Sequence, residues 1–311
     1  MSLAPFVQIV GRGPGRSRSL TMGEAASAMD LMLTPEAAPE AFGALLMLLR
    51  MKGETAEEIA GFAQAAQAAL PSMPGADLDW PSYAAGRTRG APWFLLSARI
   101  VADAGHRVLL HGWNGTDQKV RDALSQAGIR TARTPDEASA ILDSDSIAYL
   151  PLENFHPALF SLLRLRDVLG LRSCINTVCR MLNPAAAASS VQGVFHPSYR
   201  LLQADAASLL GWQNLTVIKG GGGEFERHPA KDIAAFGLRN GALWEGTFNA
   251  SVGVTRRLAE HGAAYDLNDP TDFDESVIVG TAAAALETLG WRNATKTAHR
   301  LWRARTPRKA A

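Results

Sequence analysis

The chain has 311 residues, of which 47% are hydrophobic and 20% are charged. This length and composition exclude a disordered chain and predict roughly two domains with a sizeable buried core. The formal net charge of +1 argues against a uniformly basic nucleic-acid-binding protein, although it leaves room for local basic patches.

The sequence contains no stretch that predicts insertion into a membrane. No apolar run reaches the roughly 18 residues of a spanning helix. The opening segment MSLAPFVQIVGRGPGRSRS turns to Gly, Pro and Arg and lacks the apolar region of a signal peptide. We therefore expect a cytoplasmic protein with no membrane partner. Cys174 and Cys179 have apolar neighbours and no further metal-ligating residues close by, so we expect buried free thiols and no metal.

The first third of the chain predicts a small helical domain. Residues 1–20 are basic and rich in turn residues, and no acidic side chain occurs before Glu24. Thr21 with Glu24 and Thr55 with Glu58 fit capping boxes, in which each side chain bonds an unpaired backbone N–H at a helix start. Thr34 before Pro35 predicts a further helix start, and Gly53 predicts a helix end.

The remainder alternates between short apolar runs and helical patterns. Residues 71–92 are interpreted as a linker and loop. Strands are predicted at 107–111, 147–152 and 215–219, and helices at 117–126, from 134 onwards and at 157–169. Strands separated by helices predict an α/β fold with a largely parallel sheet that is covered on both faces.

The C-terminal segment is strongly basic. Residues 292–309 hold seven Arg or Lys and no Asp or Glu, and Ala294, Ala298 and Trp302 recur at helical spacing. This pattern predicts a helix docked by an apolar stripe. Its basic face, which includes Arg300 and Arg303, is either solvated or binds nucleic acid.

Several collinear segments resemble anthranilate phosphoribosyltransferase, a member of glycosyltransferase family 3. They are GALLMLLRMKGETAEEIAGF, VLLHG at 108–112, LRDVLGLRSCINTVCRMLNPAAAASSVQGVFHP at 165–197, and TVIKGGGGEFE at 216–226. The resemblance spans about residues 20–300. It implies the nucleoside phosphorylase/phosphoribosyltransferase type of fold, with a helical domain at 1–72, an α/β domain at 73–311 and a cleft between them. It also implies that helices from about 157–182 rejoin the first domain, and that homodimers form through the helical domain.

The family transfers a phosphoribosyl group from a diphosphate donor that is held by a glycine loop, hydroxyl groups and Mg²⁺ carboxylates. In this sequence the glycine loop falls near 86–90, where Arg87 and Arg89 stand at positions that let the family's backbone approach the diphosphate closely. The segment that carries the family's hydroxyl groups falls on 92–95, where those groups are missing. The metal carboxylates fall on Phe225 and Glu226, and Glu226 alone is a poor magnesium site. The family's donor and metal sites are therefore expected to be degenerate, and the motif DLDWPSYAAGRTRGAPWFLL resembles the YbiB-like branch, which is associated with nucleic-acid binding.

The candidate phosphate-binding residues are basic or lie in glycine-rich loops: Arg16, Arg18, Arg87, Thr88, Arg89, Lys219, Gly221, Gly222, Arg300 and Arg303. Guanidinium groups grip phosphates bidentately. The alternative is that Arg87 and Arg89 are solvated, and that the glycines after Lys219 serve a turn with positive φ.

The candidate cleft residues follow the resemblance: Gly86, His111, Gly112, Asn114, His156, Arg166, Asn183 and Glu226. His111 has no visible catalytic partner and is interpreted as a hydrogen-bonded structural histidine. Arg164 and Arg166 point about 200° apart on a helix, and the resemblance favours Arg166 for the cleft. Trp93 and Phe94 are expected to pack in the core rather than to stack on bases.

Three functions follow from these patterns. The first is a non-biosynthetic homodimer that binds single-stranded DNA or RNA without a cofactor. The second is a transferase that moves a phosphoribosyl-type group to an aromatic or nucleobase acceptor, with Mg²⁺ as cofactor and a small molecule in the cleft. The third is anthranilate phosphoribosyltransferase itself.

Overall fold

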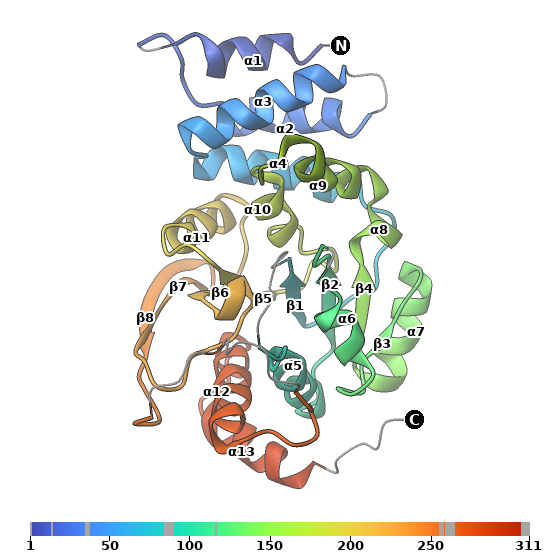
Figure 1. Ribbon diagram of the computed structural model, residues 1–311, viewed down its shortest axis with the longest axis vertical. Helices are drawn as coiled ribbons and strands as arrows, with labels where there is room; N and C mark the ends of the chain where they lie inside the picture. Colours follow the sequence, from blue (N-terminus) through green and yellow to red (C-terminus); the bar gives the residue numbers. More distant parts are fainter. Residues whose placement is uncertain are drawn as a thin grey trace.

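The computed structural model describes residues 2–13, 15–34, 38–83, 90–115, 117–254, 258 and 265–305. A helical layer stands above a sheet, and a second group of helices covers the opposite face of that sheet (Figure 1). The helical layer comprises α1 (Ala4–Gly11), α2 (Met22–Met32), α3 (Pro39–Lys52), α4 (Ala56–Ala68), α9 (Pro157–Leu169) and α10 (Ile175–Arg180). The predicted α/β architecture with a helical N-terminal domain is confirmed.

The helical layer forms where the caps predict it. Thr21 and Glu24 form a full capping box at the start of α2, and Thr55 and Glu58 form one at the start of α4. Gly53 ends α3 with a positive φ, as predicted. Helix α3 starts at Pro39, later than the start predicted at Thr34–Pro35. The Thr34 hydroxyl does not cap a helix start; it donates a hydrogen bond to the carbonyl of Leu31. Pro35 lies outside the described residues.

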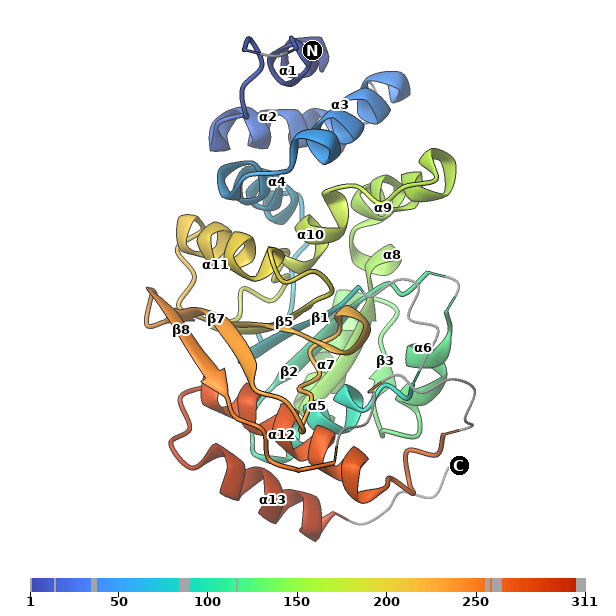
Figure 2. The ribbon, with the colours of Figure 1, turned by 60° about the vertical axis from the view of Figure 1, so that its left-hand side comes forward.

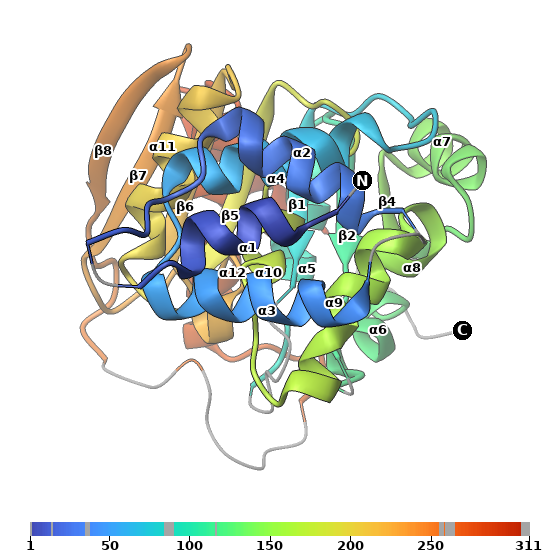
Figure 3. The same cartoon turned by 90° about the horizontal axis from the view of Figure 1, so that it is seen from above.

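Helix α1 was not predicted, because the basic and turn-rich residues around it masked the apolar segment that forms it. It packs beside α3 at the outer surface of the helical layer (Figure 3). Helix α10 contacts both α4 and α9, so the middle of the chain does return to the helical layer.

The eight-stranded sheet has the order β3-β4-β2-β1-β5-β6-β7-β8. Its strands are β1 (Leu78–Ser82), β2 (Val108–Gly112), β3 (Arg130–Thr131), β4 (Ile147–Pro151), β5 (Ser189–Val194), β6 (Asn214–Lys219), β7 (Ile233–Arg239) and β8 (Ala242–Phe248). Pairings from β3 to β6 are parallel, whereas β6-β7 and β7-β8 are antiparallel. The sheet is therefore largely parallel, as predicted, with an antiparallel hairpin at one edge.

Strand β1 corrects the interpretation of residues 71–92 as a linker and loop. It lies in the middle of the sheet although it contains Asp79 and Pro81, two residue types that are depleted in strands. Its pairing with β5 covers only Leu78 and Asp79, so beyond Asp79 the strand pairs with β2 alone. Pro81, which has no backbone N–H, is tolerated because one edge of the strand is unpaired there.

Two buried clusters hold the fold together. One joins the helical layer to a face of the sheet across α8 (Leu152–Phe155) and α11 (Tyr199–Leu209). The other fills the opposite face beneath α5 (Phe94–Asp103), α6 (Lys119–Leu124), α12 (Asp272–Thr288) and α13 (Ala294–Ala304). Figure 2 shows α11 between the helical layer and the sheet, with α12 and α13 beyond the sheet. Because the first cluster is continuous from α4 onto the sheet, the boundary near residue 72 stays a prediction.

The other elements are α7 (Pro135–Asp145), which begins at the predicted Thr134 cap, and a short 3₁₀ turn, η1 (Gly221–Gly223). Among the described residues, no helix is long and apolar enough to cross a membrane.

Candidate functional site

The sheet topology marks one place for a site. From β1 the chain passes to β2 beside it, then to β3 at the edge of the sheet and back to β4 between them, before it crosses to the other side of β1 to form β5. In open parallel sheets the crevice for a ligand lies at the carboxyl ends of the strands where this reversal occurs. Here those ends are Ser82, Gly112 and Val194.

The glycine-rich segment after β6 closes down on this crevice. A Cβ on Gly193 would lie 2.1 Å from the carbonyl carbon of Glu224, and one on Gly220 would lie 1.6 Å from the Glu224 oxygen. Gly222 has a φ of 63°, in the left-handed region. The glycines therefore allow the backbone of residues 224–226 to pass tightly over the end of β5, which is a structural reason for their presence.

Glu226 contacts the first turn of α5. Its side chain is fully buried, and Oε1 accepts a hydrogen bond from the backbone N–H of Phe94, at 3.1 Å. The N-terminus of a helix binds anions, because its N–H groups have no partner within the helix and the dipole is positive there. At α5 a carboxylate of the protein itself occupies this position.

Phe225, where the resemblance places a metal carboxylate, points into the core. Its ring meets that of Trp80 edge-on, with centroids 5.5 Å apart, and Trp80 stacks against Phe94 at 6.4 Å. Phe94 and Trp93 are both buried, which confirms that they pack in the core.

Glu224 is a second buried carboxylate, which the sequence analysis did not single out. Its Oε1 accepts from the Ser82 hydroxyl at 3.0 Å and from the Asn114 amide at 3.2 Å. Asn114 therefore lies beside Glu224 at the carboxyl end of β1, and its assignment as a ligand-binding residue stays a prediction. Two carboxylates two positions apart in an extended segment, Glu224 and Glu226, were the available signal. Among the described residues no group of three or more metal-ligating side chains occurs.

His111 lies beneath the crevice in a closed hydrogen-bond network. Its Nδ1 is 2.8 Å from the Tyr83 hydroxyl and its Nε2 is 3.0 Å from Asp79 Oδ1. The Ser190 hydroxyl donates to Asp79 Oδ2 at 2.7 Å. His111, Tyr83 and Asp79 are fully buried, and burial raises the pKa of Tyr83 well above its usual value. The structural interpretation of His111 is confirmed, and Asp79 and Tyr83 are the partners that sequence reasoning missed.

Gly112 ends β2 with its Cα against β1. A Cβ there would lie 1.9 Å from the carbonyl oxygen of Ser82. Its role is close strand packing, next to the crevice.

Arg166 reaches the same end of the sheet from α9. Its guanidinium lies 5.8 Å from the ring centroid of Trp113, which directly follows β2. Its buried Nη1 finds no hydrogen-bond acceptor among the described residues. Arg164 instead points to solvent beside Asp167, as the helical period predicts.

His156 and Asn183 lie away from the carboxyl ends of the strands, where the helical layer meets the rest of the chain, and their assignment as cleft residues stays a prediction. His156 begins α9: its Nε2 lies 3.1 Å from the carbonyl of Ala66, and its Nδ1 accepts from the N–H of Leu159. The Asn183 amide bonds both backbone groups of Ala187 and thereby shapes the turn before the amino end of β5, the end opposite the crevice. Both side chains hold elements together.

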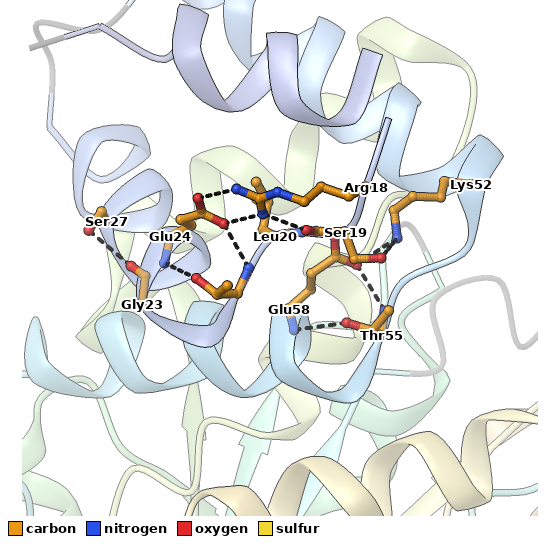
Figure 4. A network of polar contacts seen from close by, with 10 residues as sticks. Arg18, Ser19, Leu20, Gly23, Glu24, Ser27, Lys52, Thr55 and Glu58 are labelled. Carbon is orange, nitrogen blue, oxygen red and sulfur yellow. Dashed lines mark hydrogen bonds and ion pairs between the residues drawn. The ribbon is translucent and has the colours of Figure 1, made fainter. Parts of the chain in front are cut away.

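Arg18 is engaged within the helical layer (Figure 4). Its guanidinium grips the Glu24 carboxylate with two hydrogen bonds of 2.7 Å. That contact and the backbone N–H of Thr21 lower the pKa of Glu24 to about 2. Arg16 is exposed nearby. Arg18 therefore forms an ion pair within the helical layer, whereas Arg16 has no ion-pair partner among the described residues.

Helix α13 carries the clearest basic surface. It docks by Ala294, Ala298 and Trp302, as predicted. The opposite face exposes Lys296, Arg300 and Arg303 at spacings of four and three residues, and none of them has an ion-pair partner in the described part of the chain. Because α13 and α1 lie at opposite ends of the molecule (Figure 1), the two basic termini do not form one patch within a protomer.

The other predicted phosphate contacts divide into two groups. Lys219 is exposed at the end of β6, Gly222 is exposed beside it, and Gly221 is buried. Gly86, Arg87, Thr88 and Arg89 lie outside the described residues.

Both Cys174 and Cys179 are buried free thiols, as expected. Burial raises the pKa of each.

The comparisons with known proteins agree with this architecture. The family described as "Glycosyl transferase family, helical bundle domain" matches residues 5–69, and "Glycosyl transferase family, a/b domain" matches residues 94–261.

Curated relatives are enzymes of one kind. The chain is 32% identical over 249 residues to anthranilate phosphoribosyltransferase from Xanthobacter autotrophicus, covering 78% of this chain and 72% of that protein. It is 27% identical over 271 residues to the same enzyme from Geobacillus kaustophilus, covering 85% and 80%.

Solved structures share the fold. Anthranilate phosphoribosyltransferase from Thermus thermophilus superposes with a TM-score of 0.81 at 20% identity, covering 97% of this chain and 94% of that one. The Saccharomyces cerevisiae enzyme in complex with PRPP and Mg gives 0.76 at 16% identity, covering 96% and 92%. The chain belongs to the glycosyl transferase family that includes anthranilate phosphoribosyltransferase.

Proposed function

We propose that this family member is a non-biosynthetic protein that binds single-stranded nucleic acid through phosphate contacts and does not use a phosphoribosyl diphosphate donor. The observation that carries the proposal is the Glu226 carboxylate bonded to the N–H of Phe94. A diphosphate at the start of α5 would meet this buried negative charge in place of free N–H groups. The repulsion between like charges is large where water is excluded.

The residues at the crevice do not fit a magnesium-bound diphosphate. Phe225 is committed to the core, Glu226 to the α5 backbone, and Glu224 to Ser82 and Asn114. Hard cations need several oxygen ligands that converge on one point, and these two carboxylates are already engaged in the packing of the crevice.

The exposed stripe of α13 supports the nucleic-acid half of the proposal. Lys296, Arg300 and Arg303 form a row of unneutralised cations on a chain of near-neutral net charge. Such a row suits a phosphate backbone, and contacts of this kind tolerate any base sequence and weaken as salt rises.

The test is filter binding of a single-stranded oligonucleotide at about 50 and about 200 mM salt. Changing Lys296, Arg300 and Arg303 together to Gln is expected to weaken binding and to reduce the slope of log K against log salt by about 2, since each lost single-strand contact removes about 0.7. The matched control changes Arg107, Arg130 and Arg164 to Gln, which removes the same charge from surface arginines that are each paired with an aspartate. Equal loss in both triple variants, or wild-type binding without salt dependence, would refute the proposal.

A phosphoribosyl transferase is the second candidate. The favouring observation is Arg166, whose unbonded Nη1 lies beside Trp113 near the crevice, within a family whose named relatives are transferases. Calorimetry with phosphoribosyl diphosphate and Mg²⁺ separates the two functions. Metal-dependent micromolar binding would establish the transferase and overturn the first proposal. Rescue of a tryptophan auxotroph would show anthranilate phosphoribosyltransferase itself.

A homodimer through the helical layer completes the proposal. Met51 at the end of α3 is 84% exposed and Val168 on α9 is 82% exposed, which is unusual for large apolar side chains on neighbouring elements. Sedimentation at micromolar concentration is expected to give twice the chain mass, and Val168→Asp is expected to shift it to the monomer.

A further inference from the structure

A small pocket lies between the helical layer and the carboxyl end of β5, where it adjoins the crevice at Val194. It is lined by the end of α3, the turn from α9 into α10, and the segment that leads from β5 into α11. Its volume is about 260 Å³. This is just below the roughly 300–1,000 Å³ of drug-sized ligand sites, so the pocket suits a small group.

Three arginines converge on this pocket: Arg50, Arg172 and Arg180. Arg180 is 9% exposed, and its guanidinium is fixed by the carbonyls of Gly193 at 3.1 Å and Asn176 at 3.0 Å. Arg50 donates to the carbonyl of Arg172 at 2.7 Å. Carbonyl acceptors orient a guanidinium but do not neutralise its charge.

No carboxylate pairs with these three arginines in the part of the chain that the structure describes. Glu54 is the one acidic side chain among the lining residues, and it accepts a hydrogen bond from the Tyr199 hydroxyl at 3.2 Å. The lining side chains hold three arginines and one glutamate, 3 − 1, which leaves a formal charge of +2 on the lining with His196 neutral. Behind the lining, the buried Glu224 attracts Arg180 and offsets part of that charge.

The arginines repel one another. The pKa of Arg172 is lowered by burial and then by the charges of Arg166, Arg180 and Arg50. Like charges held together at a partly desolvated site destabilise the folded chain, and a bound anion offsets that cost. The remaining lining groups, which include Asn176, Thr177 and Ser173, supply further hydrogen-bond donors.

We propose that this pocket is a binding site for a phosphate monoester, held by Arg50, Arg172 and Arg180. The dianion matches the formal charge of the pocket, and the guanidinium fork matches the geometry of phosphate oxygens. The three arginines are separate from the basic face of α13 and from the crevice residues Glu224 and Glu226, although Val194 borders both places. The proposal therefore goes beyond the proposed nucleic-acid function and stands without it. The phosphate comes from a small phosphorylated metabolite or from the 5′ end of an oligonucleotide.

The test is calorimetry of the full chain in a low-salt chloride buffer with inorganic phosphate as the probe. Wild type is expected to bind one phosphate per chain. Arg172→Gln alters an exposed side chain that has no ion-pair partner among the described residues. It is expected to weaken binding by roughly tenfold or more, the effect of losing one charge-assisted contact. The matched control is Arg164→Gln, which removes an equal charge from an exposed arginine outside the pocket.

A second pair of probes identifies the source of the phosphate. The two probes are a dinucleotide with a 5′-phosphate and the same dinucleotide with a 5′-hydroxyl. Tighter binding of the phosphorylated probe by wild type, without that difference in Arg172→Gln, supports the site with a nucleic-acid end as ligand. Phosphate binding without that difference supports the site with a small metabolite as ligand. Absence of phosphate binding in wild type, or equal weakening by Arg172→Gln and Arg164→Gln, would overturn the proposal. Because α13 is unchanged in every variant, failure here leaves the filter-binding test intact.

Discussion

Glu58 is predicted to be the most sensitive polar residue of the helical layer. It is fully buried, and its carboxylate has three partners (Figure 4). Oε1 accepts from the N–H of Leu20 at 2.8 Å, while Oε2 accepts from the N–H of Thr55 at 2.9 Å and from Lys52 Nζ at 2.8 Å. One side chain therefore ties the segment before α2 and the end of α3 to the first turn of α4.

The change Glu58→Gln keeps the shape and removes the charge. The glutamine amide has a single acceptor oxygen, so the backbone N–H of either Leu20 or Thr55 faces an NH₂ group instead of an oxygen. The ion pair with Lys52 is lost as well. Breaking a buried pair in this way costs about 3–5 kcal/mol, which is a large share of the roughly 5–15 kcal/mol that stabilises a typical protein.

The second capping box supplies the control. Glu24→Gln alters the same motif at a partly exposed position, where the ion pair with Arg18 is screened by solvent. Its cost is expected to stay below about 1 kcal/mol. Urea unfolding of both variants at neutral pH, with the slope m checked for constancy, measures the two losses. Equal losses from Glu58→Gln and Glu24→Gln would refute the reasoning that burial, and not the capping motif, sets the magnitude.

Two further predictions follow from burial. Burial lowers the pKa of His156, whose Nδ1 accepts a hydrogen bond from the N–H of Leu159. Below the unfolded pKa of about 6.5 the unfolded chain therefore takes up a proton before the folded chain does, and the free energy of unfolding falls as the pH falls. Urea unfolding between pH 7.5 and 5.5 is expected to show a smaller loss of stability for His156→Asn than for wild type. Cys174 and Cys179 are buried with raised pKa, so a thiol reagent is expected to label neither in the folded chain and both in urea.

Local signals predicted the elements whose ends are set by short-range chemistry. The boxes at Thr21 and Thr55 and the stop at Gly53 work within one turn of helix, so the sequence alone contains what determines them. The β7-β8 hairpin was missed although Asn240-Gly241, with φ of 51° and 78°, is the dipeptide that favours such a turn. Strand β1 was missed for another reason: Pro81 is tolerated only because β5 stops pairing at Asp79, and that depends on the partner strand.

The site was predictable only in part, because its chemistry depends on which groups meet across the fold. Asn114 and Glu226 were named as cleft residues from the resemblance, and in the structure they bond Glu224 and the first turn of α5, contacts that the sequence does not reveal. The pairing of Arg18 with Glu24 involves two residues close in sequence and could have been anticipated from their charges. The network around His111 could not, since Asp79 lies in β1 and Tyr83 directly follows it, in a segment that the sequence analysis had interpreted as a linker and loop.

The glycine run shows how one feature can serve two different chemistries. In a phosphate loop, glycines let a ligand approach the backbone; here Gly193 and Gly220 let another part of the same backbone approach, and Glu224 and Glu226 fill the space. The requirement for glycine is the same in both cases, so the pattern alone cannot distinguish them. What distinguishes them is the residue that follows: once Phe225 enters the core beside Trp80, the segment is anchored over the crevice, and a ligand would have to displace a buried aromatic ring as well as two buried carboxylates.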